Sequence, residues 1–283
     1  MKPKYLIIMM APLLACLIVT ILAYFAAFAM TVITGQVDVL DTYSALVDEG
    51  IFNLFRFTLI IIMCGVWYMK SFPDIFYHRE APFSVILKKT FHPMGIIPLI
   101  LLGGSIQIAT DSILYVLGHF FRTAFASYEH MMETFEGSNS VLFIITVCTI
   151  GPVAEELLFR GLTLQYAMKA FDNKKYKYAI AVFIQAILFA VYHGNIIQST
   201  YAFIFGLLFG AITVKAGSVL PSIITHCTVN ASLYLLPADI YKYPKRAFVI
   251  MIISLLALIG SFALAYIHFG SKSSTDDDDK PSE

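Results

Sequence analysis

Eight long runs of apolar residues constrain the fold of this chain more than any other feature of its sequence. They lie near residues 5–34, 51–69, 93–118, 141–168, 178–194, 198–215, 218–236 and 247–269. A helix needs about 20 apolar residues to cross the hydrocarbon core of a bilayer, and these runs approach or exceed that length. Only 13% of the residues are charged, against about a quarter in a typical soluble domain. The sequence therefore predicts an integral membrane protein with about eight spans.

The apolar runs favour helices over the strands of a membrane barrel. They are continuous, without the alternation of apolar and polar residues that barrel strands show. We expect an all-α, polytopic transmembrane helical bundle that forms a single domain over residues 1–270, with the motif-bearing core at 145–236. The N-terminal run is interpreted as the first span, because it is too long for the apolar core of a signal peptide. The polar tail 271–283 should be disordered, and since residues 276–280 match an enteropeptidase-type tag sequence, the tail is either native or tag-derived.

Positively charged residues fall in alternating loops. The N-terminus and the segments 70–89 and 169–177 are rich in basic residues, whereas the segments 35–50 and 119–140 are acidic. Lysine and arginine favour the cytoplasmic side of a membrane, so we expect both chain ends in the cytoplasm and a location in the cell membrane. The basic loop 237–246 disagrees, because a count of eight spans places it outside. Either the charge bias is overruled there or one span is miscounted.

The composition excludes several classes of partner and site. The 19 basic and 19 acidic residues give a net charge of zero, which favours neither a nucleic acid nor an acidic ligand. The four cysteines lie within apolar runs and lack paired spacing, so they indicate neither a disulfide framework nor a zinc cluster. The lipid bilayer is the partner that the composition predicts, and the oligomeric state stays open.

Ionisable residues inside apolar runs are costly, so they mark candidate functional positions. The adjacent carboxylates Glu155 and Glu156 are followed by Arg160 in one such run. Glu156 and Arg160 are four residues apart on one helical face, which predicts an ion pair, whereas Glu155 points about 100° away and stays free. The other isolated charges in apolar runs are interpreted as structural: Arg56 and Asp111.

Three further polar residues are predicted to reach the depth of Glu155. His226 and Asn230 are four residues apart and share a face of their helix. At about 1.5 Å per residue, Glu155 and His193 each lie about 24 Å along their helices from the basic loop that joins them. We therefore expect Glu155, His193, His226 and Asn230 to surround one cavity inside the bundle.

Three motifs occur in one order in the second half of the chain: Glu155-Glu156-xxx-Arg160, Phe189-xxx-His193 and His226-xxx-Asn230. At these residues the sequence resembles the CAAX protease and bacteriocin-processing family, the relatives of type II CAAX prenyl endopeptidases. The resemblance covers roughly residues 145–236. Each motif alone is a weak signal, whereas the ordered set is specific.

The resemblance implies an intramembrane endopeptidase that acts on a hydrophobic or lipidated peptide. In such enzymes the first Glu and the first His activate water, which implies these roles for Glu155 and His193. The later His and Asn stabilise the oxyanion, which implies that role for His226 and Asn230. The residue types suit this chemistry, because carboxylates and imidazoles exchange protons while imidazoles and amides donate hydrogen bonds to oxygen. Glu156 and Arg160 are expected to support the site structurally.

Two alternatives stay open. Family members are often described as metalloproteases, and Glu155, His193 and His226 could bind zinc. The chain lacks an HExxH motif, so we favour activation of water without a metal or another cofactor. Bacterial members are also linked to bacteriocin immunity, so the alternative function is a non-catalytic immunity or peptide-binding membrane protein of the same fold. A transporter is less favoured, because no inverted repeat is evident.

Overall fold

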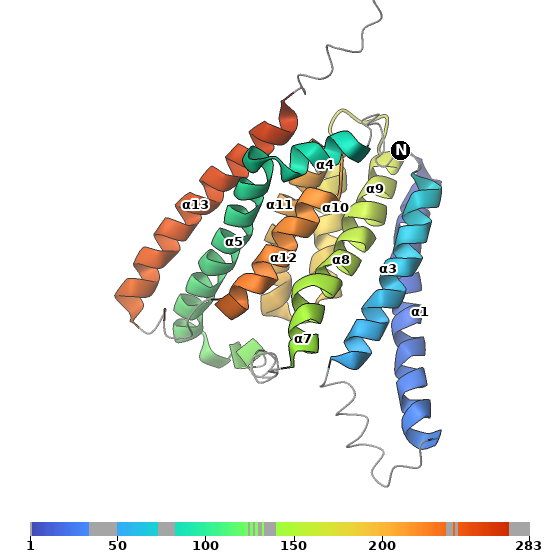
Figure 1. Cartoon of the computed structure of the whole chain (residues 1–283), viewed down its shortest axis with the longest axis horizontal. Coiled ribbons are helices and arrows are strands. Elements are labelled where there is room, and N and C mark those ends of the chain that lie inside the picture. The colour runs from blue at the N-terminus through green and yellow to red at the C-terminus, as the bar shows by residue number, and fades with distance from the viewer. Residues whose placement is uncertain are drawn as a thin grey trace, which may run out of the picture.

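The fold is helical, without strands, throughout the part of the chain that the structure describes (Figure 1). The structure, a computed structural model, describes residues 2–33, 50–72, 83–123, 125, 126, 128, 129, 132, 140–235, 240 and 243–271. In chain order, with η for a π-helix, its elements are α1 (Pro3–Ile33), α3 (Ile51–Ser71), α4 (Phe83–Phe91), α5 (Pro93–Phe120), α7 (Val141–Ile145), η1 (Thr146–Ile150), α8 (Gly151–Glu156), η2 (Leu157–Thr163), α9 (Leu164–Ala170), α10 (Lys177–Tyr192), α11 (Ile196–Ala216), α12 (Leu220–Leu235) and α13 (Pro244–Gly270). The predicted all-α fold is confirmed.

Each predicted apolar run corresponds to a helical segment of the bundle. Among the described residues, six segments are long and apolar enough to cross a membrane: α1, α3, α5, the continuous segment from α7 to α9, α11 and α13. The other two runs correspond to α10 and α12, which have 16 residues each, or about 24 Å of helix. They run beside the longer helices in Figure 1. The chain is therefore an integral membrane protein, and the prediction of about eight spans is consistent with this arrangement.

Helix α4 lies outside the predicted runs. It has nine residues, too few to cross a bilayer, and lies across one end of the bundle (Figure 1). Phe83 and Phe91 are exposed at its two ends, and Lys88 and Lys89 lie in its last turn. This mixture of exposed aromatic and basic side chains is typical of a helix at a membrane interface.

Close packing of α10 against α11 fixes the position of α10 in the bundle. A Cβ atom added at Gly206 would lie 2.8 Å from the Cα atom of Ala186, so glycine is required at this contact. Across the same contact, Gln185 Nε2 donates a hydrogen bond of 2.6 Å to the Gly206 carbonyl. In lipid, where apolar surface alone does not drive helices together, small residues and interhelical hydrogen bonds stabilise such pairs.

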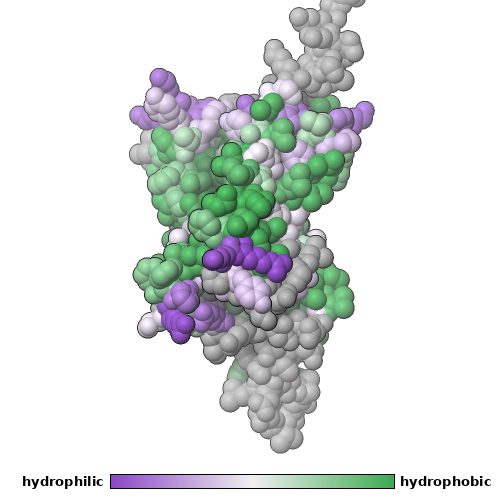
Figure 2. All heavy atoms as spheres, turned by 90° about the vertical axis from the view of Figure 1, so that its left-hand side faces the viewer, coloured by the Kyte–Doolittle hydropathy of each residue, from purple (hydrophilic) through white to green (hydrophobic). Residues whose placement is uncertain are grey.

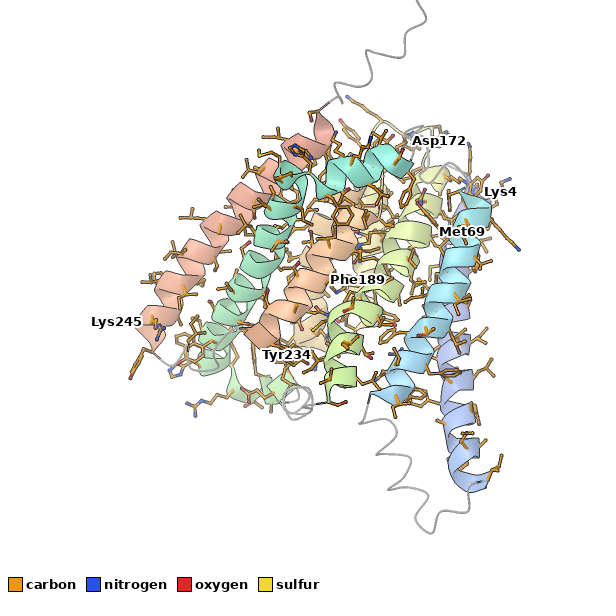
Figure 3. All side chains as sticks on the ribbon, viewed as in Figure 1. Lys4, Met69, Asp172, Phe189, Tyr234 and Lys245 are labelled. Atoms are coloured by element: carbon orange, nitrogen blue, oxygen red, sulfur yellow. The ribbon has the colours of Figure 1, made fainter. Side chains whose placement is uncertain are left out.

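The two ends of the bundle differ in charge. One end, called here the lysine-rich end, carries ten lysines: Lys2, Lys4, Lys70, Lys88, Lys89, Lys169, Lys174, Lys175, Lys177 and Lys215. The opposite, lysine-poor end carries among the described residues Arg122, Glu129, Lys245 and Arg246. Figure 3 labels Lys4 and Asp172 at the first end and Tyr234 and Lys245 at the second. Figure 2 shows a hydrophobic belt between hydrophilic residues that gather toward the two ends.

Several predicted loops and the tail fall largely outside the described residues. Only Gly50 of the segment 35–50 and only Ser271 of the tail 271–283 are described. The basic loop 237–246 joins α12 to α13, and Figure 3 places the start of α13 at the lysine-poor end. The start of α13 thus agrees with the count of eight helical segments rather than with the charge of the sequence before it.

Candidate active site

The helical segment from α7 to α9 is irregular where it passes the site. In η1 the Gly151 N–H donates to the Thr146 carbonyl, five residues earlier, rather than to the Val147 carbonyl four residues earlier. The next residue, Pro152, has no N–H to offer. The Val147 carbonyl therefore lacks a donor at either position, and Asn230 Nδ2 donates to it at 2.9 Å from α12. The local π-helix and the proline together hold the Asn230 side chain in place.

Glu156 and Arg160 form a buried ion pair behind the site. Arg160 Nη1 lies 2.8 Å from Glu156 Oε1, and both side chains are 0% exposed. The guanidinium lies over the rings of Phe189 and Phe209, 4.3 and 5.2 Å from their centroids. A cation over an aromatic face is stabilised by the ring quadrupole, most strongly where water is absent. This is the pairing that the spacing of four residues predicts.

His226 lies between the two glutamates. Its Nδ1 is 2.9 Å from Glu156 Oε1, and its Nε2 is 3.9 Å from Glu155 Oε2. Because the carboxylate of Glu156 pairs with an arginine and can only accept, we assign the hydrogen to Nδ1 of His226. In the neutral imidazole, Nε2 is then unprotonated and faces Glu155. The spacing along one helix does not predict this contact, because the two residues are 70 positions apart.

His193 directly follows α10 and is oriented by that helix. Its Nδ1 is 2.8 Å from the Phe189 carbonyl, which can only accept, so this nitrogen also carries the hydrogen. Gly194 has a φ of +71°, which turns the chain from α10 toward α11. The Asn195 side chain then accepts hydrogen bonds from two backbone N–H groups and caps α11. The Nε2 atom of His193 is thus left as its available proton acceptor.

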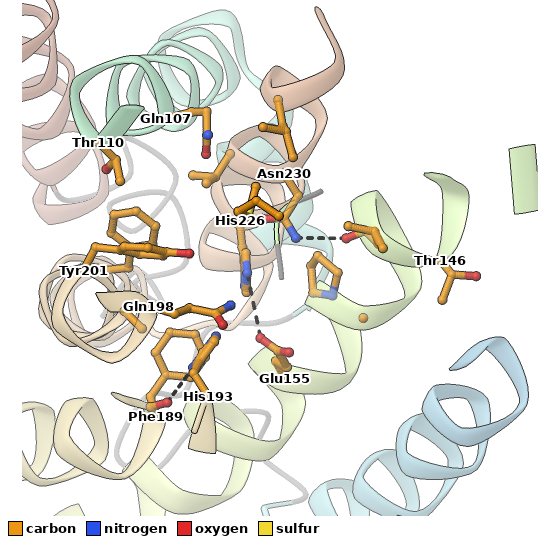
Figure 4. Close-up of a pocket in the computed structure, with 18 of the residues that line it drawn as sticks. Gln107, Thr110, Thr146, Glu155, Phe189, His193, Gln198, Tyr201, His226 and Asn230 are labelled. Atoms are coloured by element: carbon orange, nitrogen blue, oxygen red, sulfur yellow. Dashed lines mark hydrogen bonds and ion pairs between the residues drawn. The ribbon is translucent and has the colours of Figure 1, made fainter. Parts of the chain in front are cut away.

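The four residues predicted to form the site line one pocket of about 270 Å³ (Figure 4): Glu155, His193, His226 and Asn230. Glu155 is 16% exposed and His226 7% exposed, so both side chains are accessible yet largely shielded. Glu156 and Arg160 are not among the lining residues. The two adjacent glutamates therefore differ in environment, as expected from their separation around the helix. The pocket combines a carboxylate, two imidazoles and an amide, a set able to transfer protons and to donate hydrogen bonds to an oxyanion.

Arg56 and Asp111, interpreted from the sequence as structural, also line the pocket. Arg56 Nη2 donates to Asn53 Oδ1 at 3.2 Å, and Gln107 Nε2 donates to Asp111 Oδ1 at 2.8 Å. Both charges come from helices that carry none of the three motifs. Their signal in the sequence was the isolated charge in an apolar run, which by default marks a functional position.

A zinc ion would need at least three protein ligands that converge on one point. The hydrogen bonds at Nδ1 leave Nε2 of His193 and His226 as the ligand atoms, which is how metal-bound histidines are commonly oriented. Within the described part of the chain, however, no three His, Cys, Asp or Glu side chains lie close enough together to hold a metal ion.

Comparison with known proteins gives one match. The family model described as Type II CAAX prenyl endopeptidase Rce1-like matches residues 137–232, which include all residues of the three motifs. Neither the curated proteins nor the solved structures contain a match to the chain. The resemblance indicated by the motifs is confirmed: residues 137–232 match the Rce1-like type II CAAX prenyl endopeptidases, a protease family.

Proposed function

We propose that this protein is an intramembrane endopeptidase of the cell membrane, with its N-terminus in the cytoplasm, that hydrolyses a peptide bond in a hydrophobic or lipidated peptide. The observation that carries the proposal is the convergence of Glu155, two imidazole Nε2 atoms and the Asn230 amide on one pocket within the bundle. Ionisable groups are expensive at this depth, and a hydrolytic site gives a reason for their presence.

In the proposed reaction, Glu155 and His193 accept a proton from a water molecule as its oxygen attacks the substrate carbonyl. The tetrahedral intermediate carries its negative charge on the former carbonyl oxygen. Asn230 donates to that oxygen from Nδ2, and His226 donates from Nε2 when that nitrogen is protonated. The proton held by Glu155 and His193 passes to the leaving amine as the carbon–nitrogen bond breaks. Water is consumed, one new carboxylic acid group and one new amine form, and the protein returns to its starting state.

The experiment that tests this function is hydrolysis by the purified protein in lipid vesicles, run in water enriched in heavy oxygen. A panel of hydrophobic and lipidated peptides is incubated with the protein, and the products are analysed by mass spectrometry. We expect fragments whose new carboxyl terminus contains one heavy oxygen atom, since the attacking oxygen comes from water. Peptides that bind to the vesicles in a protein-dependent manner but stay intact would instead support the non-catalytic peptide-binding alternative.

Asn230→Leu is expected to lower kcat by about 10²- to 10³-fold, because one donor to the oxyanion is lost. It should also lower the free energy of unfolding by about 1–3 kcal/mol, because the Val147 carbonyl loses its hydrogen-bond donor. Thr228→Val on the same helix is the matched control, since its hydroxyl bonds to the Ile224 carbonyl and it does not line the pocket. Steady-state kinetics and thermal unfolding of both variants are the measurements. Unchanged kcat in Asn230→Leu would remove Asn230 from the oxyanion site.

Chelation is expected to leave the activity unchanged. The proposed mechanism uses water and protein groups alone, so dialysis against a strong chelator should not lower kcat. Metal analysis of the dialysed protein is done on the same sample, so that activity is read at a known zinc content. Loss of activity on chelation, with recovery on zinc addition and about one zinc bound per chain, would replace this mechanism by water activated on a metal.

A further inference from the structure

The residues that line the active-site pocket come from the parts of the helices that lie nearest the lysine-poor end. Arg56 lies five residues after the start of α3, and Tyr201 five residues after the start of α11. Thr146 lies five residues after the start of α7, and all three of these helices begin at the lysine-poor end (Figure 1). Helix α10 ends there, and His193 directly follows it. The pocket therefore extends from Glu155 toward this end of the bundle.

Helix α5 and the segment that follows it complete the wall. Gln107, Thr110 and Asp111 lie in the second half of α5, which ends at the lysine-poor end. Tyr128 and Met132 also line the pocket and come after the end of that helix. The part of the pocket wall nearest the lysine-poor end thus consists of polar side chains of α5 and of residues that follow this helix. Polar side chains are expected where a pocket meets water.

Toward the lysine-rich end the pocket is closed by packed aromatic side chains. Phe159, Phe189 and Phe209 are at most 1% exposed, and the rings of Phe159 and Phe189 are 5.0 Å apart. The guanidinium of Arg160 stacks on Phe189 and Phe209 in the same layer. Buried side chains that pack against one another in this way leave no passage for a peptide.

The charges at the two ends indicate which side of the membrane each faces. Ten lysines lie at the lysine-rich end, whereas the cations described at the other end, apart from Arg56 in the pocket, are Arg122, Lys245 and Arg246. Lysine and arginine close to the ends of spans favour the cytoplasmic side. The lysine-rich end is therefore assigned to the cytoplasm and the lysine-poor end to the opposite side.

We infer that the active-site pocket is entered from the extracytoplasmic side, and that the substrate is a peptide segment exposed on that side of the membrane. That the bound peptide is cleaved as a substrate rests on the proposed function, whereas the side of entry is independent of that function. The matching substrate class is an exported peptide or an extracytoplasmic segment next to a membrane span. Its polar part would lie near Gln107 and Thr110, and the bond to be cleaved would lie near Glu155.

Thiol labelling of intact cells tests the side of entry. In a variant whose four native cysteines are replaced by serine or alanine, single cysteines are introduced at Thr110 in the pocket wall, at Ser112 and at Lys175. Ser112 is the matched control on α5, because it is fully buried at almost the same depth. A membrane-impermeant maleimide is added before or after the membrane is permeabilised. We expect Thr110→Cys to react in intact cells, Lys175→Cys to react only after permeabilisation, and Ser112→Cys to react in neither case.

Three results would overturn the inference. Reaction of Lys175→Cys but not Thr110→Cys in intact cells would mean that the pocket faces the cytoplasm. Reaction of both positions from the same side would mean that the pocket is entered from the lysine-rich end. No reaction of Thr110→Cys under either condition would mean that the pocket is closed to water on the extracytoplasmic side.

A second measurement separates the side of entry from the proposed function. The same hydrophobic peptide is tethered to a membrane anchor on either the extracytoplasmic or the cytoplasmic side of cells that contain the protein. We expect cleavage of the first tethered peptide alone. Cleavage of only the cytoplasmic peptide would refute the inference while supporting the peptidase. A third outcome is that the cysteines are labelled as expected but no peptide is cleaved, even by the purified protein. This outcome would refute the peptidase function while still supporting entry from the extracytoplasmic side.

Discussion

Glu155→Gln is expected to reduce peptide hydrolysis by about 10²- to 10⁴-fold, because it removes the proposed general base while keeping the size of the side chain. The fold should survive. Glu155 lies at the pocket wall, is 16% exposed, and forms no ion pair with a described lysine or arginine. The loss should therefore appear in kcat, with little change in KM and in Tm. Steady-state kinetics and thermal unfolding in detergent measure both quantities.

Asp111→Asn is the matched control for Glu155→Gln. Asp111 also lines the pocket and carries one negative charge, but it lies on α5 and accepts from Gln107, whereas Glu155 faces His226. If the pocket merely required negative charge, the two substitutions would lower kcat to a similar extent. A much larger loss for Glu155→Gln identifies the base. Unfolding of Glu155→Gln, or activity close to that of the wild type, would assign the catalytic role to another group.

The spans could be predicted from the sequence because the bilayer permits few solutions. A backbone in lipid must satisfy its own hydrogen bonds, so each apolar run of sufficient length becomes a helix. The predicted runs near 51–69 and 93–118 agree with α3 and α5 to within a few residues. Helix α4 could not be predicted in the same way, because its nine residues are too few to form an apolar run of the length that marks a membrane span.

The local geometry of the site was less accessible from the sequence. A prediction based on 3.6 residues per turn places residues around a regular helix, whereas η1 and η2 have π geometry. The sequence also did not indicate that the Val147 carbonyl would accept a hydrogen bond from Asn230. Such a bond joins two helices whose relative rotation no periodicity specifies.

Contacts between distant segments explain the remaining differences. Glu156 and Arg160 could be paired from their spacing, whereas the bond from His226 to Glu156 depends on how α12 packs against α8. Arg56 and Asp111 line the pocket for the same reason, because α3 and α5 bring them there. The sequence thus predicted four residues that line one pocket, Glu155, His193, His226 and Asn230, but not the contacts between side chains of different helices.

Glu156→Gln is expected to lower the free energy of unfolding by about 3–5 kcal/mol, because it leaves the guanidinium of Arg160 buried without its carboxylate. Both side chains are 0% exposed, so water cannot replace the lost partner. The aromatic faces of Phe189 and Phe209 offset only part of this cost, since a cation over a ring is stabilised by about 2 kcal/mol when desolvated. The variant should show a lower Tm and less folded protein in the membrane.

Two double variants separate the two contacts of Glu156. Glu156→Gln with Arg160→Met removes the stranded charge and keeps an oxygen that can accept from His226 Nδ1. Glu156→Leu with Arg160→Met also removes the charge but leaves no acceptor for that nitrogen. Replacing a buried ion pair by residues of similar volume is often close to neutral, so both double variants should recover most of the Tm lost in Glu156→Gln.

The activities of the two double variants should differ although their stabilities are similar. With Gln at position 156, His226 keeps its orientation toward Glu155, so kcat should stay close to that of the wild type. With Leu at position 156, the imidazole of His226 loses the hydrogen bond that fixes its rotation and tautomer. By analogy with other groups that orient a histidine in a functional site, kcat should then fall a further 10- to 100-fold or so at unchanged KM. Glu156 would then be a positioning residue that acts through His226. Equal kcat in the two double variants would show instead that Glu156 serves only to neutralise Arg160.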